Sequence, residues 1–184
     1  MSKLYSPLLL LLVACGDDPV SYSDAVGIEL KAKSGEVSAS NALSPDKSIT
    51  SESGNPYGKF VGDARAQLGR DPGNIQLEKV TMTLGAQSTN VASLEQVMTG
   101  DVYVQFLIND TNNTYVAGHF ASPSGLGPVA GHPDWQMLDA ADADVAKILG
   151  GSFKVVLNAP AAADFATKGA EASIQLTFTF TAFE

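Results

Sequence analysis

The chain has 184 residues, with 20 acidic side chains against 11 basic ones and a formal net charge of −9. An acidic surface of this kind repels nucleic acid and anionic lipid headgroups, so nucleic acid is excluded as a partner. Cys15 is the only cysteine, so the body carries no internal disulfide and must be held together by a packed core.

Residues 1–14 have the pattern of a targeting segment. Lys3 gives a basic start, Leu8 to Val13 form an apolar run, and Ala14 is a small residue before Cys15. A helix needs about 20 apolar residues to span a bilayer, and this run is far shorter. We therefore interpret residues 1–14 as a signal peptide that does not contribute to the fold.

Leu12-Val13-Ala14-Cys15 resembles the bacterial lipobox, in which an aliphatic residue, a tolerant position and a small residue precede a modified cysteine. The resemblance implies cleavage before Cys15, a diacylglycerol thioether on its sulfur, and an acylated amino terminus carrying chains such as palmitate. Loss of residues 1–14 removes Lys3 and no acid, which leaves 170 residues with a net charge of −10. An ordinary secretory signal that contains a cysteine is the alternative.

The lipobox resemblance also implies a place in the bacterial cell envelope, where the lipid on Cys15 holds the protein to a membrane. In well-studied envelopes an aspartate directly after this cysteine retains the protein in the inner membrane. Gly16 stands there instead, which favours the outer membrane. We interpret residues 15–24, which include Asp17 and Asp18, as an acidic tether.

The first part of the body is expected to contain one strand, one loop and one helix. Residues 26–33 alternate apolar and polar side chains, which is typical of a half-buried strand. Residues 34–55 are rich in serine and are expected to form a surface loop. Asn55 and Pro56 favour a helix start and Gly69 a helix end, so residues 56–68 are expected to be helical.

The rest of the body is expected to be mostly strand. Alternating apolar residues predict strands over 75–84, 101–109, 115–121, 152–158 and 171–183. The alternation of 75–84 changes phase near Glu78 and Lys79, which indicates a β-bulge. A helical turn is expected within 92–98, a Gly/Pro-rich loop over 122–135, and a helix over 139–149.

These elements predict a mainly β fold for residues 25–184 as a single domain. Strands with one solvent-exposed face predict an antiparallel β-sandwich of immunoglobulin-like architecture, with one or two short helices in the crossovers. A closed barrel is the alternative. The cysteine and tryptophan pattern of antibody domains is absent, so only the architecture is inferred.

The chain offers few residues for catalysis or metal binding. Cys15 is used for lipid, and there is no Gly-x-Ser-x-Gly motif of the kind that positions a nucleophilic serine. His119 and His132 are the only imidazoles, and Asp134 could join them in a metal site or a hydrolase centre. Because one histidine is expected on a strand and the other in a loop, ordinary structural roles are favoured, and no catalytic residue, metal ligand or cofactor is assigned.

Two loops have residues that suit binding. Residues Asn109–Asn113 carry oxygen atoms that calcium prefers, but the same residues are typical of a tight hairpin turn, and the turn is favoured. His132, Asp134 and Trp135 lie in the second loop, where the sole tryptophan could contact a partner or ligand. The alternative, that Trp135 closes the end of the sandwich, is favoured.

The sequence therefore leads to three functional hypotheses. The first is a non-catalytic module, held by lipid, that engages another envelope or surface protein through its exposed sheet edges. The second is a lipoprotein that binds a small ligand or a glycan. The third, and least supported, is a hydrolase built on His119, His132 and Asp134.

Overall fold

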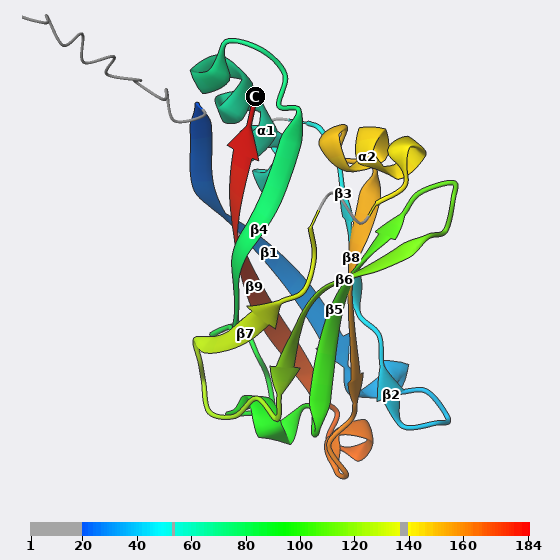
Figure 1. Ribbon diagram of the computed structural model, residues 1–184. Helices are drawn as coiled ribbons and strands as arrows, with labels where there is room; N and C mark the ends of the chain where they lie inside the picture. The colour runs from blue at the N-terminus through cyan, green and yellow to red at the C-terminus, as the bar shows by residue number, and fades with distance from the viewer. Residues whose placement is uncertain (1–19, 53, 137–139) are drawn as a thin grey trace, which may run out of the picture.

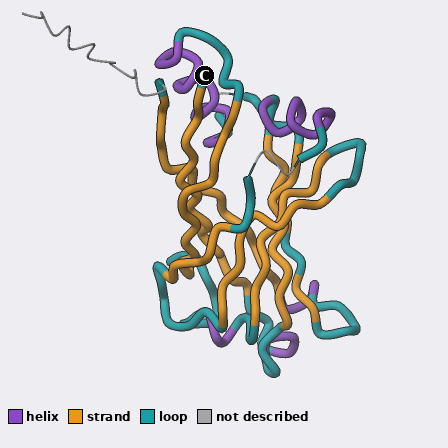
Figure 2. The backbone as a smooth tube through the Cα atoms, in the orientation of Figure 1, coloured by secondary structure: helices purple, strands orange, loops and turns teal. Residues whose placement is uncertain are grey.

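The computed structural model describes residues 20–52, 54–136 and 140–184 (Figure 1). The expected signal peptide, Cys15 and the first half of the tether (15–19) therefore lie outside the described residues, as does Asp139. The described chain forms one antiparallel sheet with two α-helices gathered at one end, as Figure 2 shows. No helix in this part of the chain combines the length and the apolar character needed to cross a bilayer.

The described strands form a nine-stranded sheet in the order β1-β9-β4-β7-β6-β5-β8-β2, and β3 also pairs with β8. All of the pairings are antiparallel. The strands are β1 (Ser21–Lys33), β2 (Ala42–Leu43), β3 (Asp46–Ile49), β4 (Asn74–Leu84), β5 (Asp101–Ile108), β6 (Thr114–Ala121), β7 (Val129–Pro133), β8 (Phe153–Pro160) and β9 (Glu171–Phe183).

The sheet is curled, so that its two halves face each other. The short strand β7 joins the halves because it pairs with β4 on one side and with β6 on the other. Across the interior, the ring of Phe106 on β5 lies 5.9 Å from Phe178 and 6.4 Å from Phe180 on β9. The mainly β, antiparallel prediction is confirmed, and the curled sheet is a half-barrel rather than two clearly separate sheets.

Helix α1 (Pro56–Leu68) covers one end of this core (Figure 1). Its start is capped because the Asn55 side chain accepts a hydrogen bond from the backbone N–H of Tyr57 at 3.0 Å. Its end is set by Gly69, whose φ of 74° suits glycine. The helix buries Phe60 against the Phe180 ring, with 5.6 Å between centroids. The predicted helix is thus confirmed at both ends.

Helix α2 (Asp142–Leu149) lies at the same end of the sheet (Figure 1). It is tied to α1 because the buried Tyr57 hydroxyl donates to the backbone carbonyl of Ile148 at 3.0 Å. Burial raises the pKa of this Tyr57 hydroxyl, which keeps the group neutral. Three single-turn 3₁₀ helices complete the described elements: Ser34–Glu36, Leu94–Gln96 and Phe165–Thr167.

Several strand predictions are confirmed and three segments differ. The bulge of β4 lies between Leu77 and Lys79, and β9 has the expected bounds. Residues 34–55 are not one loop, because β2 and β3 form there by pairing with β8. Residues 122–135 contain β7, which the glycines and prolines concealed. The sheet also begins at Ser21, inside the expected tether.

Candidate functional site

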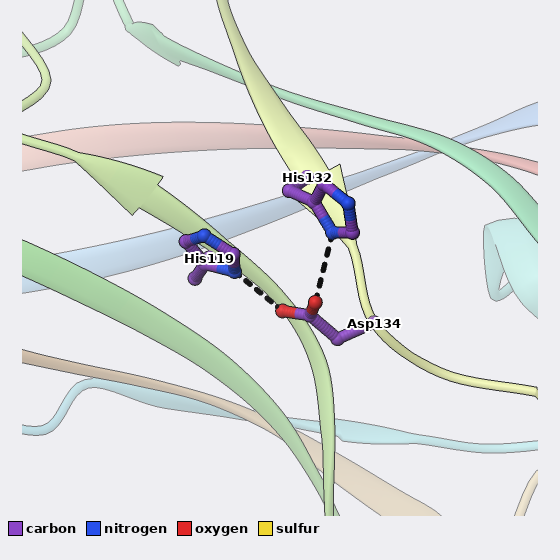
Figure 3. Close-up of side chains that lie close together, drawn as sticks. All are labelled: His119, His132 and Asp134. Carbon is purple, nitrogen blue, oxygen red and sulfur yellow. Dashed lines mark hydrogen bonds and ion pairs between the residues drawn. The ribbon is translucent and has the colours of Figure 1, made fainter.

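The polar cluster of His119, His132 and Asp134 lies on β6 and at the end of β7 (Figure 3). His119 and His132 are direct partners in the β6–β7 register. Residues opposite each other in neighbouring strands have Cβ atoms about 5 Å apart, so this register brings the two imidazoles together. Asp134 comes two residues after His132, and alternate residues of an extended chain face the same side. The prediction that His132 lies in a loop is therefore wrong, because His132 belongs to β7.

One carboxylate joins the two rings. The Asp134 Oδ2 atom lies 2.6 Å from Nδ1 of His119, and its Oδ1 atom lies 2.8 Å from Nδ1 of His132 (Figure 3). The rings are stacked, with centroids 5.3 Å apart and planes inclined by 26°. The side chains of His119, His132 and Asp134 are 40%, 70% and 27% exposed, respectively. The cluster is therefore ordered by its own contacts and open to solvent.

Two glycines allow β6 and β7 to approach closely at this point. A Cβ atom on Gly118 would lie 2.8 Å from the backbone oxygen of His132. A Cβ atom on Gly131 would lie 2.7 Å from the Phe120 ring and 3.0 Å from the backbone oxygen of His119. Distances of 2.7 and 2.8 Å are shorter than real Cβ contacts, so a side chain at either position would force the neighbouring strand or ring to shift.

A β-bulge fixes the third member of the cluster. The register of β5 against β6 shifts between Val104 and Gln105, opposite Ala117. The carbonyl of Ala117 accepts a hydrogen bond from the backbone N–H of Asp134 at 3.0 Å. The bulge therefore supplies the acceptor that holds Asp134 beside the two histidines.

The cluster has the composition of a metal site. One ligand atom from each of the three residues lies within 4.8 Å of the others. Imidazole and carboxylate are the ligand types that divalent transition metals use in proteins. Among the hydrogen bonds of the described residues, neither ring contacts a serine hydroxyl, so the arrangement of a serine hydrolase is not formed there.

Trp135 does not belong to this surface, although it follows Asp134 directly. Its side chain is only 3% exposed. The ring lies edge-on to Phe106, with 5.4 Å between centroids. Trp135 therefore packs in the core, and of the three residues in the proposed partner loop only His132 and Asp134 are accessible.

The Asn109–Asn113 loop uses its polar groups to hold the hairpin onto α2. Asp110 forms an ion pair with Lys147. Asp144 of α2 accepts hydrogen bonds from Thr111, Asn113 and Tyr115, each at 2.7 to 2.8 Å. These donors, the Tyr115 hydroxyl first among them, lower the pKa of the Asp144 carboxyl. The contacts give the loop a structural role.

A separate groove of about 440 Å³ lies between β1 and β3. These strands are the two ends of the sheet, since β1 pairs only with β9 and β3 only with β8 among the described residues. The lining includes Gly27 and Lys31 of β1, Lys47 and Ile49 of β3, and Pro56 at the start of α1. The half-barrel is therefore open along this seam.

The role of Gly118 and Gly131 was not predicted from the sequence, although a glycine inside a strand is itself a signal of close backbone approach. His119, His132 and Asp134 were considered, but no local pattern could show that they meet. Comparisons of the chain with models of known protein families, with characterised proteins and with solved structures found no match. The functional inference therefore depends on the residues of this chain.

Proposed function

We propose that this protein is a lipid-anchored component of the bacterial cell envelope that binds another envelope or surface protein without catalysing a reaction. Lipid on Cys15 would hold it to a membrane, with the outer membrane favoured by Gly16. The observation that carries the proposal is the open seam between β1 and β3. Edge strands present unpaired backbone N–H and C=O groups, and an extended segment of a partner can pair with them.

The free edge of β1 is suited to such pairing over the stretch that lines the groove. The outward side chains of this stretch contact side chains of β9. Glu29 accepts a hydrogen bond from the Ser173 hydroxyl at 2.8 Å, and the Lys31 Nζ atom lies 3.6 Å from the Glu171 Oε1 atom. A Cβ atom on Gly27 would meet no other atom within 4 Å. Among the described residues no other strand is paired to this edge of β1, so an added strand could pair there with its alternate side chains facing the groove.

The groove favours a polypeptide over a sugar or a small apolar ligand. Its lining residues include Lys31, Lys47, Glu29 and Asp46 but no aromatic side chain. Glycan sites rely on aromatic rings over the sugar faces, and the sole tryptophan is buried elsewhere. The hydrolase hypothesis finds no support in this groove, because the histidine cluster does not line it.

The likeness of this fold to immunoglobulin-like envelope modules is also part of the proposal. Its support is the aromatic core in which the two halves of the sheet meet, with the ring of Phe106 5.9 Å from that of Phe178. Such modules expose edge strands for partners, which is the use proposed here for β1.

Photo-cross-linking in intact cells tests the proposed function. A photoreactive residue placed at Lys47, inside the groove, should capture one reproducible envelope protein. The same residue at Gln87, which is exposed and does not line the groove, should not capture it. Gly27→Phe should abolish the capture because the ring would occupy the space beside β1. Equal capture from both positions, or self-links alone, would contradict the proposal.

A further inference from the structure

We propose that His119, His132 and Asp134 form a binding site for one divalent first-row transition-metal ion, with zinc as the representative. The inference does not depend on the envelope partner, because the cluster lies on β6 and β7, in the middle of the strand order, whereas the groove lies at the two ends. Two imidazoles and one carboxylate are a ligand set seen in open zinc sites, where solvent or a substrate takes the fourth position.

The ligand atoms already converge. Both histidines direct Nδ1 toward the same carboxylate, at 2.6 Å for His119 and 2.8 Å for His132 (Figure 3). In a tetrahedral zinc site with bonds of about 2.0 to 2.1 Å, neighbouring ligand atoms lie about 3.3 Å apart. The two nitrogen–oxygen distances are shorter than this, and all three ligand atoms lie within 4.8 Å of one another, so an ion would enter after small adjustments of the side chains. On coordination at Nδ1, each neutral ring would carry its proton on Nε2.

The backbone holds this arrangement before any ion arrives. Register pairs His119 with His132, the two glycines allow the strands to approach, and the Ala117 carbonyl holds the backbone of Asp134 at 3.0 Å. A site whose ligands are placed by paired strands loses less conformational freedom on binding than a site on loose loops. The fold thus lowers the entropic cost of binding an ion here.

The ligand types and the exposure indicate the class of ion. Two nitrogen ligands favour zinc, copper, nickel or cobalt over calcium and magnesium, which prefer oxygen. Two neutral imidazoles and one carboxylate carry a single negative charge, so a bound divalent ion keeps a net charge of +1. The 40% and 70% exposed histidine side chains leave room for water or for a donor atom of another molecule to complete the coordination.

Calorimetric titration of the full chain in detergent with zinc chloride tests the site. We expect saturable binding of one ion, at least about tenfold weaker in His119→Ala, His132→Ala and Asp134→Asn. Asp101→Asn removes an exposed acid from the neighbouring strand β5 and should leave the affinity unchanged. Magnesium should produce no binding at this site. Proton NMR should show the imidazole signals of both histidines shifting together as the first equivalent of zinc binds.

Thermal melts of the three variants show whether a loss of zinc affinity comes from the missing ligand or from unfolding. Variants that melt like the parent chain without metal are folded, so their loss of affinity reports on the ligands. Zinc should also raise the melting temperature of the parent chain and of Asp101→Asn, but not of His132→Ala. Equal zinc affinity in all variants would overturn the assignment. So would binding of several ions that persists without both histidines, because it would show adventitious binding to surface carboxylates.

Discussion

Replacing Phe106 by alanine should destabilise the whole domain, because this ring connects the two halves of the curled sheet. Its side chain is 1% exposed. The ring lies 5.1 Å from Phe153 on β8, 5.4 Å from Trp135 and 5.9 Å from Phe178 on β9. Truncation of a buried phenylalanine lowers the free energy of unfolding by about 3 to 5 kcal/mol. With partners on both halves of the sheet, we expect about 4 kcal/mol at Phe106.

Urea denaturation followed by tryptophan fluorescence and by far-ultraviolet circular dichroism measures this loss. Trp135 is the only tryptophan and contacts Phe106, so its fluorescence reports on the core. For a domain of this size a loss of 1 kcal/mol lowers Tm by about 2 to 4 °C, so Phe106→Ala should lower Tm by about 8 to 16 °C. The two signals should change together in a single transition, because one core joins both halves.

Leu126→Ala is the matched control, since Leu126 is 61% exposed. A surface substitution of this kind should change the free energy of unfolding by no more than about 0.5 kcal/mol. If Phe106→Ala costs less than about 1 kcal/mol, the ring is not the central contact that its geometry indicates. Two separate transitions in the parent chain would likewise refute the single core.

Three further predictions concern the hairpin, the histidine cluster and the anchor. The lowered pKa of Asp144 means that its contribution to stability is present above the unfolded-state pKa of about 3.9 and is lost as the pH falls through the folded-state pKa. Asp144→Asn should therefore reduce the difference between the urea midpoints measured at neutral and acidic pH. Gly118→Ala should push β7 away from β6, lower the free energy of unfolding by about 1 to 3 kcal/mol and weaken zinc binding in calorimetry. Mass spectrometry of the membrane fraction should find a mature chain that starts at acylated Cys15.

Two of these predictions have matched control variants. Asp142→Asn changes an exposed acid in the same helix turn and should not alter the pH dependence as Asp144→Asn does. Gly35→Ala adds a methyl group where no atom lies within 4 Å and should leave zinc affinity unchanged. Unchanged zinc affinity in Gly118→Ala would contradict the close strand approach as a requirement of the site. An unmodified cysteine at position 15 would contradict the lipid anchor.

The elements that were predicted correctly are those whose signals are local. The β9 strand alternates apolar and polar residues along its length, and burial follows that alternation from Ile174 to Ala182. Helix α1 carries its cap at Asn55 and its stop at Gly69 in the adjacent sequence. The β4 bulge was visible because the apolar phase changes around Glu78. In each case a residue and its near neighbours contain the information.

The elements that were missed are held by distant partners. The β3 strand is four residues long, and it is a strand because β8 offers it an edge. The β7 strand contains Gly131 and Pro133, which indicate a loop, yet it pairs on both sides with β4 and β6. Short strands of this kind have little intrinsic preference, so the surrounding sheet decides their conformation.

The sequence by itself determined the class of the fold and both ends of α1. Through the lipobox resemblance it also predicts an anchor at Cys15, which stays a prediction. It also supplied the two histidines and Asp134 as candidates for a metal or catalytic centre. Tertiary structure alone decided that they meet, because strand register brings His119 to His132 and the carbonyl at the Ala117 bulge holds Asp134 beside them. It likewise decided that the sheet stays open between β1 and β3, since curl and closure arise from pairings across the whole domain.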